Sequence, residues 1–373
     1  MTHTQPAEGP LAGLRVLEFA TIGPGPYACL LLAELGADVL RLDRFEGPGL
    51  AGAAAGLNRS RPAVPIDLKS PVGRELALDL ASRADVLIEG NRPGVMERLG
   101  LGPQECLGRN PRLVYGRMTG WGQEGPLSQA AGHDINYAGL TGALHMIGPR
   151  EKPMPAANLV ADFGGGALFL VTGVLAALHE RERSGLGQVV DAAMVDGAAS
   201  LTTMMYTMLG AGLWRDEREA NYLDGAAPFY GTYRCADDRF VAVGALEPQF
   251  YRALVDGLGV AHRLTGEQFE QSAWPAHRAL FAEAFAARGR DEWVDRFEGT
   301  DACVTPVLSL SEAPQHPHLQ ARETFVSIGG IVQPAVAPRF SRSGTRPPTP
   351  PGTHTVDAVR DWIAGKGPFT DSA

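Results

Sequence analysis

The chain has 373 residues, which is too long for one compact core and predicts two domains. Charged residues make up 20% of the chain and hydrophobic residues 45%, the composition of a globular protein and not of a disordered one. The net charge of −9, without any run rich in Lys or Arg, argues against a protein that binds nucleic acid or a membrane surface.

Four cysteines, far apart and without CxxC spacing, predict buried thiols in a reducing compartment and no disulfide framework or metal site. They are Cys29, Cys106, Cys235 and Cys303. The N-terminal sequence MTHTQPAEGP has no basic segment followed by an apolar one, so no signal peptide is expected. The longest apolar run, 167–178, is too short to cross a bilayer as a helix. We therefore expect a soluble, cytoplasmic protein.

Short apolar segments alternate with helical patterns through the first 120 residues. Strands are expected at 14–20, 38–43, 63–68, 85–90 and 112–118, and helices at 26–37 and 70–84. Ser70 is the expected cap of the second helix, with Pro71 in its first turn. The alternation predicts an α/β fold with a parallel doubly wound sheet, whose ligands bind beyond the carboxyl ends of the strands. That rim comprises residues 21–26, 43–44, 67–69, 90–92 and 119–123.

The sequence GPGPYA at 23–28 matches the dinucleotide-binding pattern G-x-G-x-x-A, and Asp43 ends the second predicted strand about 20 residues later. That pattern binds a pyrophosphate through backbone N–H groups. Pro24 and Pro26 have no N–H group, and Pro24 is expected within the loop itself. A nicotinamide cofactor is therefore disfavoured.

The sequence pattern changes after residue 120, where the regular alternation of short strands and helices ends. The remaining pattern predicts a long apolar helix over 158–185 with Asp162 as its possible cap, a low-charge stretch over 187–212, a hairpin over 229–245 that turns at 236–238, helices at 248–259 and 276–299, a strand at 302–310, and an exposed Pro-rich tail at 347–351. We divide the chain into a large α/β domain (1–185), linker helices (186–224), a small α+β domain (225–300) and a C-terminal segment (301–373).

The segment AGHDINYAGL at 131–140 places four polar side chains within five positions. Its plain interpretation is a polar helix start, with Asp134 as the cap and with Asn136 and Tyr137 solvated. The alternative is a functional site that begins with the adjacent pair His133 and Asp134. These residues alone leave both interpretations open.

Several longer strings together resemble the family III CoA-transferases, the CaiB/BaiF superfamily. They are GPLAGLRVLEFATIGPGPYACLLLAELGADVLRLDR, NRPGVMERLGLGP, RLVYGRMTGWGQEGP, GHDINY, ADFGGG, GQVVDAAMVDG and FVAVGALEPQFY, and they cover most of the chain. The HD pair after AG favours the α-methylacyl-CoA racemase branch over the transferases. The family uses its glycine loops for folding and dimer packing, so the resemblance also argues against a dinucleotide site.

The resemblance implies an interlocked homodimer of two-domain protomers. Each large domain is a Rossmann-like sheet to which the C-terminal segment returns, and it holds the CoA part of an acyl-CoA substrate while the partner's small domain closes the site. His133 and Asp162 are then the acid/base residues, and Glu247 of the partner orients the histidine. The implied CoA-binding residues are Arg44, Ile66, Asp67, Leu68, Lys69, Gly90, Asn91, Arg92, Arg98, Gly132, Asp134 and Tyr137. Neither a metal nor a separate cofactor is implied.

The chemistry of racemisation agrees with this pair. Inverting the carbon beside a thioester requires one group to remove a proton from one face and another to deliver a proton to the opposite face. Histidine is the residue type suited to proton transfer near neutral pH, which favours His133, whereas Asp162 needs a pKa raised by burial. As a plain helix cap, Asp162 would instead have a lowered pKa. The run 163–166 suggests a helix N-terminus whose free N–H groups could stabilise an enolate.

Other interpretations stay open at this point. A CoA-transferase would use Asp162 as a nucleophile, forming an acyl anhydride and then a CoA thioester on its carboxylate, and a non-enzymatic acyl-CoA-binding protein would use neither acid/base group. Glu247 could be a surface residue. Met204, Met205 and Met208 suit either core packing or an adaptable surface for an acyl tail. Asn91 replaces an aromatic residue common in relatives, and the loop 45–62 offers little to hold a nucleotide.

Overall fold

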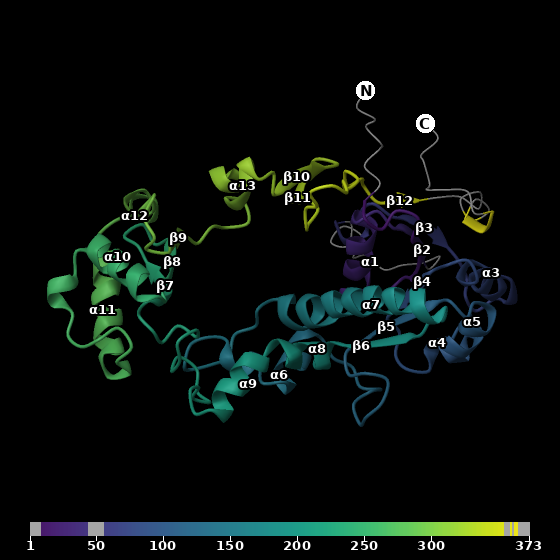
Figure 1. The fold of residues 1–373 in the computed structure, drawn as a ribbon, viewed down its shortest axis with the longest axis horizontal. Coiled ribbons are helices and arrows are strands. Elements are labelled where there is room, and N and C mark those ends of the chain that lie inside the picture. The colour runs from purple at the N-terminus through teal and green to yellow at the C-terminus, as the bar shows by residue number, and fades with distance from the viewer. Residues whose placement is uncertain (1–8, 44–55, 354–358, 360–361, 365–373) are drawn as a thin grey trace. The chain divides into compact units, whose positions relative to one another are not determined.

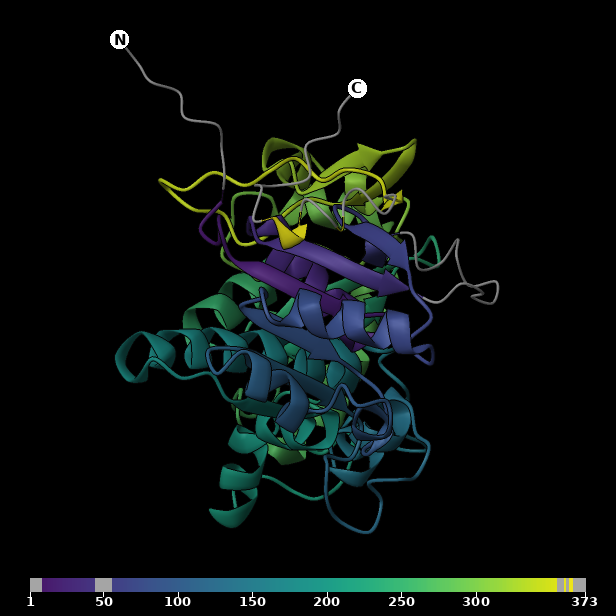
Figure 2. The ribbon, with the colours of Figure 1, turned by 90° about the vertical axis from the view of Figure 1, so that its right-hand side faces the viewer.

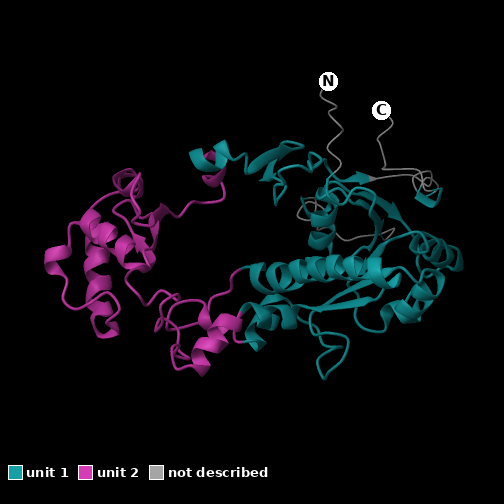
Figure 3. Ribbon diagram, in the orientation of Figure 1, with its two compact units in different colours: residues 1–141, 157–201, 317–373 teal, residues 142–156, 202–316 magenta. Residues whose placement is uncertain are grey.

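The computed structural model describes residues 9–43, 56–353, 359 and 362–364. The chain divides into two compact units, each assembled from separate stretches (Figure 3). Unit 1 comprises Met1–Thr141, Ala157–Leu201 and Pro317–Ala373, and unit 2 comprises Gly142–Ala156 and Thr202–His316.

Unit 1 is built on a parallel sheet of seven strands, in the order β12-β3-β2-β1-β4-β5-β6 (Figures 1 and 2). The bounds are β1 Arg15–Phe19, β2 Asp38–Asp43, β3 Pro62–Pro65, β4 Val86–Glu89, β5 Val114–Thr119, β6 Val189–Ala193 and β12 Gly352–Thr353. The five strands predicted in the first 120 residues are all present, which confirms the doubly wound α/β fold. Strand β6 lies in the stretch where linker helices were expected.

Helices cover both faces of this sheet. They are α1 Pro24–Glu34, α3 Pro71–Ala81, α4 Val95–Arg98, α5 Pro103–Arg109, α6 Asp134–Leu140, the π-helix η2 Leu159–Ala167, α7 Leu168–Ser184 and α8 Met194–Leu201. Alternate residues of β1 point to opposite faces. Leu17 and Phe19 join the apolar core formed with α3, α4 and α5. The buried carboxylate of Glu18 faces the other way, towards the Cys29 thiol of α1, and pairs with Arg41 at 2.6 Å and Arg61 at 2.9 Å.

The π-helix and α8 meet through their backbones. A Cβ atom on Gly197 would lie 1.8 Å from the Gly165 carbonyl oxygen, and one on Gly165 would lie 2.4 Å from the Ala198 nitrogen. Only glycine permits so close an approach. The glycine run 164–166 therefore lies inside a helix and serves packing, contrary to the expected helix N-terminus with free N–H groups.

The π-helix continues into α7 without interruption. The combined helix, Leu159–Ser184, has 26 residues and is long and apolar enough to cross a membrane by length and composition alone. It exceeds the expected limit because the helix also includes residues 159–166, in which Asp162 is the only charged residue. Within unit 1, α7 packs on β5, β6 and α1 (Figure 1).

Unit 2 has its own antiparallel sheet, β7-β8-β9, and its own apolar core. Its elements are α9 Thr203–Gly210, β7 Tyr230–Arg234, β8 Phe240–Gly244, α10 Pro248–Leu258, α11 Trp274–Phe285, α12 Arg290–Phe297 and β9 Val304–Pro306. The predicted hairpin is confirmed. The helix predicted over 276–299 is two helices, because Gly289 starts α12 with its N–H donating to Glu292 Oε2 at 2.8 Å.

Short elements complete both units. Four 3₁₀-helices are η1 Leu144–Met146, η3 Ala261–Arg263, η4 Gln271–Ala273 and η5 Ala313–Gln315. In unit 1, α13 Pro317–Ala321 precedes an unpredicted hairpin, β10 Phe325–Ile328 and β11 Ile331–Pro334. Its two-residue turn, Gly329–Gly330, has positive φ angles of 57° and 81°, which suit glycine.

The C-terminal segment packs against the large sheet. The segment 347–351, expected as an exposed tail, leads into β12, and the Thr349 carbonyl accepts the Ser60 N–H at 2.8 Å. Trp362 is fully buried in the core shared with α3 and α5. All four cysteines are free thiols, and Cys303 is exposed, contrary to the expectation that all are buried.

The glycine contact gives a stability prediction. Gly197→Ala should lower the free energy of unfolding by ~1–3 kcal/mol or more, because the backbones of η2 and α8 must separate. Gly108→Ala is the matched control: a Cβ there meets nothing within 4 Å, so a gain of up to about 1 kcal/mol is expected. Urea denaturation measures both, and equal stabilities for the two variants would contradict the close contact.

Candidate functional site

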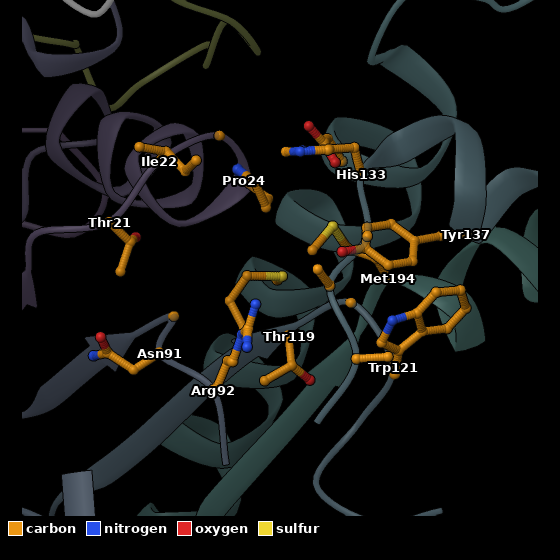
Figure 4. A pocket seen from close by; sticks show the side chains of 18 of the residues that line it. Thr21, Ile22, Pro24, Asn91, Arg92, Thr119, Trp121, His133, Tyr137 and Met194 are labelled. Atoms are coloured by element: carbon orange, nitrogen blue, oxygen red, sulfur yellow. The ribbon is translucent and has the colours of Figure 1, made fainter. Parts of the chain in front are cut away.

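The strand order of unit 1 reverses between β1 and β4. After β1 the chain enters α1 on one face, and after β4 it enters α4, whose Met96 lies in the core of the opposite face. Ligands of such sheets bind in the crevice beyond this reversal. A cleft of about 380 Å³ lies there (Figure 4). Its lining comprises residues 21–24, 90–93, 118–121, 128, 130–133, 137, 162 and 194, all in unit 1.

The first helix contributes an unusual N-terminus to the cleft. Gly23 is the N-cap with a φ of +70°, and Pro24 is already the first helical residue. The expected placement of Pro24 in a loop is therefore wrong, because α1 starts two residues before the predicted helix. Pro24 and Pro26 nevertheless lack N–H groups. The first turn of α1 therefore offers fewer donors than a turn that binds the pyrophosphate of a dinucleotide needs. A Cβ atom on Gly23 would lie 3.4 Å from Asp162 Oδ2, so this turn approaches the Asp162 carboxylate.

His133 is the residue directly before α6. Its backbone N–H donates to Asn136 Oδ1 at 3.0 Å, and its carbonyl accepts the Asn136 N–H at 2.8 Å. Asn136 is thus a capping partner of His133 rather than merely a solvated residue. The side chain of His133 is exposed and lines the cleft, where its ring points towards Pro24 (Figure 4).

Asp162 lies inside the π-helix, whose N-cap is Asn158, so its interpretation as a helix cap is wrong. Burial raises the pKa of its carboxyl, and the nearby charge of Asp134 raises it further. A hydrogen bond with Asn158 and the charge of His133 act in the opposite direction. The net direction is the one that acid/base chemistry near neutral pH requires.

Asp134 is the first residue of α6, and only 7% of it is exposed. Its Oδ2 atom accepts the backbone N–H groups of Ala161 at 2.7 Å and of Asp162 at 2.8 Å. Its interpretation as the cap of its own helix is therefore wrong: it binds the start of the π-helix instead. The carboxylate does not belong to the lining of the cleft.

Tyr137 forms part of the cleft wall. Only 5% of it is exposed, so it is not the solvated residue of the plain interpretation. Its ring meets the Trp121 ring edge-on, with centroids 4.7 Å apart, and a Cβ on Gly120 would lie 2.2 Å from it. Burial raises the pKa of the phenol, as does the charge of Asp162, whereas Arg92 lowers it.

The structure separates the expected CoA-binding residues into two groups. Gly90, Asn91, Arg92, Gly132 and Tyr137 line the cleft. Ile66, Asp67, Leu68, Lys69 and Arg98 do not, and Arg44 and the loop 45–55 lie outside the described residues. Asp67, Lys69 and Arg98 are exposed, whereas Ile66 is buried in the core.

The loop after β4 is fixed from beneath. The Asn91 N–H donates to Glu89 Oε2 at 2.7 Å, and Glu89 pairs with Arg117 at 3.1 Å. Glu89 is only 1% exposed and Arg117 only 7%. Burial raises the pKa of the Glu89 carboxyl, whereas the hydrogen bond from the Asn91 N–H and the charge of Arg117 lower it. This buried ion pair positions the segment that carries Arg92.

Glu247 belongs to unit 2. It is the exposed N-cap residue of α10, directly before Pro248, and its side chain makes no capping hydrogen bond. Burial raises the pKa of the Cys303 thiol, and the charge of Glu247 raises it further, which places these two residues close together.

Several lining residues were not among the candidates. They are Thr21, Ile22, Gly23, Pro24, Pro93, Met118, Thr119, Gly120, Trp121, Ser128, Ala130, Ala131 and Met194. The strand-end rule pointed to 21–24 and 119–121 without giving them a role. Met194 follows β6, a strand that the sequence pattern did not reveal. Met204, on α9, is 49% exposed, so the core-packing interpretation is wrong for it.

Comparisons with known proteins assign the family. Residues 11–355 match the sequence profile of CoA-transferase family III. The chain is 45% identical over 359 residues to an alpha-methylacyl-CoA racemase of Mus musculus, covering 94% of this chain and 93% of the relative. It is also 45% identical over 318 residues to the protein of that name from Homo sapiens, covering 85% and 82%. A CAIB/BAIF family protein from Brucella suis superposes with a TM-score of 0.82 at 25% identity, covering 95% and 100%. The chain belongs to CoA-transferase family III.

The raised pKa of Asp162 has a consequence for stability. The folded protein disfavours the ionised carboxylate, so the favourable contribution of this group is complete below its unfolded pKa and is lost as pH rises through the higher folded pKa. Asp162→Asn, which cannot ionise, should therefore have a higher Tm than the wild type at neutral pH. The difference should disappear below the ordinary pKa of 3.8. Thermal unfolding across pH measures it, and a variant less stable at neutral pH would contradict the prediction.

Proposed function

We propose that the protein is an α-methylacyl-CoA racemase, which interconverts the 2R and 2S forms of 2-methylacyl-CoA thioesters. The observation that carries the proposal is that His133 and Asp162, two different acid/base groups, line one cleft in a member of this family. They are close enough for the charge of His133 to lower the pKa of Asp162. The 45% identity to proteins named as racemases supports the same activity.

The reaction removes the α-proton from one face and returns a proton to the other. With Asp162 ionised and His133 protonated, the carboxylate removes the proton and the imidazolium donates one; the reverse protonation state acts on the other enantiomer. The intermediate is an enolate, whose oxygen needs fixed donors. Asp134 binds the N–H groups of Ala161 and Asp162 at the start of η2. In the first turn of α6, the N–H groups of Asn136 and Tyr137 donate to the His133 carbonyl, so the proposed donors are the N–H groups of Asp134 and Ile135.

The CoA part of the substrate is proposed to bind along the rim of strand ends. Arg92 lies in the cleft, and exposed Lys69 and Arg98 are cations suited to its phosphates. Except for Asp134, the remaining positions implied by the resemblance, Arg44, Asp67 and Asn91 among them, belong to the same proposal. Apart from acyl-CoA, we propose no cofactor and no metal, because the acid/base pair accounts for the chemistry.

The active form is proposed to be a cytoplasmic homodimer. Both units expose large apolar side chains, as surfaces that are covered in an assembly do. They include Leu159 (62% exposed), Leu168 (48%), Tyr206 (57%) and Leu213 (63%). Within this dimer we propose that Glu247 of one protomer meets His133 of the other, fixing its tautomer and raising its basicity.

Proton exchange tests the activity. A 2-methylacyl-CoA incubated with the enzyme in D2O should gain deuterium at the α-carbon from either enantiomer, without an acceptor acid. His133→Ala and Asp162→Ala should each lower the rate of racemisation by ~10²–10⁴-fold, the usual contribution of general acid–base catalysis. Transfer of CoA to an added free acid, without exchange, would establish the transferase alternative with Asp162 as nucleophile. If the protein binds acyl-CoA but catalyses neither proton exchange nor CoA transfer, the non-enzymatic acyl-CoA-binding alternative is correct.

Mixed dimers test the role of Glu247. Inactive His133→Ala and Glu247→Ala proteins, dissociated and reassociated together, should recover about a quarter of wild-type activity. In a statistical mixture half of the dimers are heterodimers, and each heterodimer has one site with both lesions and one with neither. One quarter of all sites is therefore intact, and only these are active if each lesion alone abolishes catalysis. Mixed dimers that are present but inactive would place Glu247 in the same subunit's site or outside the site.

A further inference from the structure

We propose that Asp134 is a positioning residue that fixes Asp162 opposite His133 and thereby couples the two acid/base groups. The inference rests on the proposed racemase function and gives Asp134 a role other than the CoA contact implied by family resemblance. Asp134 is adjacent to one acid/base residue in the chain and hydrogen-bonded to the backbone of the other, 28 residues away.

The geometry is that of a cap supplied from another helix. A single carboxylate oxygen accepts two N–H groups, at 2.7 and 2.8 Å, distances typical of charge-assisted hydrogen bonds. Ala161 and Asp162 lie in the first turn of η2, where a helix leaves its N–H groups unsatisfied. A negative charge at this position is also stabilised by the positive end of the helix dipole. The bonds therefore hold the backbone of Asp162 itself.

The other end of this link is also fixed. Asp134 is the first residue of α6, where Asn136 binds the His133 N–H at 3.0 Å. Between His133 and the backbone of Asp162 there is thus only one peptide unit, one buried side chain and one pair of hydrogen bonds. Because catalytic groups must sit within a fraction of an ångström of their productive geometry, so short a chain of contacts is suited to setting their separation.

Charge gives Asp134 a second influence on Asp162. Burial and three neighbouring residues act on the titration of the Asp162 carboxyl: burial and Asp134 raise its pKa, and Asn158 and His133 lower it. Two further residues approach it: Tyr137, whose phenol interacts with Asp162, and the uncharged Gly23, the N-cap residue of α1. Removing the charge of Asp134 while keeping its oxygen should therefore lower the pKa of Asp162 without displacing its backbone.

The test compares Asp134→Asn with Asp134→Ala in the intact dimer. The Asn variant keeps an acceptor oxygen but loses the negative charge that raises the pKa of Asp162. The acid limb of its pH profile of kcat/KM should therefore move to lower pH. The Ala variant should in addition lose about 10²-fold in kcat, the usual cost of a misplaced catalytic group. The KM for acyl-CoA should change little in both, because Asp134 does not line the cleft. An acid limb that stays in place, or a raised KM with unchanged kcat, would overturn the proposal.

Asp85→Asn is the matched control. Asp85 also accepts a backbone N–H, that of Arg15 at 3.0 Å, and it pairs with Arg181, but it lies at the amino end of β4, away from the cleft. This variant should lose stability without moving the acid limb. If it moves the limb as much as Asp134→Asn, the effect is one of general destabilisation and the proposal fails.

A second readout separates this inference from the proposed function. In protein with 13C-labelled aspartate, the carboxyl resonance of Asp162, assigned by its absence in Asp162→Asn, should titrate at lower pH in Asp134→Asn. This measurement needs no turnover. Absence of proton exchange in the wild type would refute the racemase function alone, whereas an unmoved Asp162 titration would refute the positioning role alone.

Discussion

The reversal of strand order between β1 and β4 is the constraint on which the site depends. Here α1 and α4 depart to opposite faces, so the ends of both strands stay open. The cleft occupies this opening, and three of the segments that line it lie at strand ends: 21–24 after β1, 90–93 after β4 and 118–121 at the end of β5.

The segments around the cleft are held by residues that do not themselves line it. The ion pair of Glu89 and Arg117 binds the loop after β4 from below, and the contact between Gly165 and Gly197 sets how deeply η2 can approach α8. Asp134 then attaches the start of η2 to α6. Rigid supports of this kind are what acid/base catalysis needs, since its groups work only at defined positions. A π-helix, rare in proteins and frequent at functional sites, carries Asp162 within this framework.

Much of this could be predicted from local sequence. Alternating strand and helix patterns gave the parallel sheet, and the family strings led to His133 and Asp162, which the fold brings into one cleft. The errors have physical causes. Strand β6 is short and follows a long apolar helix, so its pattern merges with its neighbours. The run 164–166 was assigned to a helix end, because glycine that permits contact between two backbones leaves the same local pattern as glycine that ends a helix.

The role of Asp134 could not be read from spacing. An aspartate at the start of a helix is ordinarily the cap of that helix, and only the tertiary fold shows that the N–H groups it binds belong to another one. Lys69 and Arg98 present the opposite case. Their strings placed them among the CoA-binding residues, yet neither belongs to the lining of the cleft.

Unit 1 is assembled from three stretches of chain, and this has a consequence for the order of folding. Its core includes Trp362, and β12 pairs with β3 at the edge of its sheet, so both are supplied only after the whole of unit 2 has been synthesised. The last stretch of unit 2, Thr202–His316, contains its sheet and its apolar core, and it leaves the ribosome before β12 and Trp362 do. The nascent chain must therefore keep the large sheet unfinished, with the edge of β3 unpaired, while the smaller unit already has all it needs to fold.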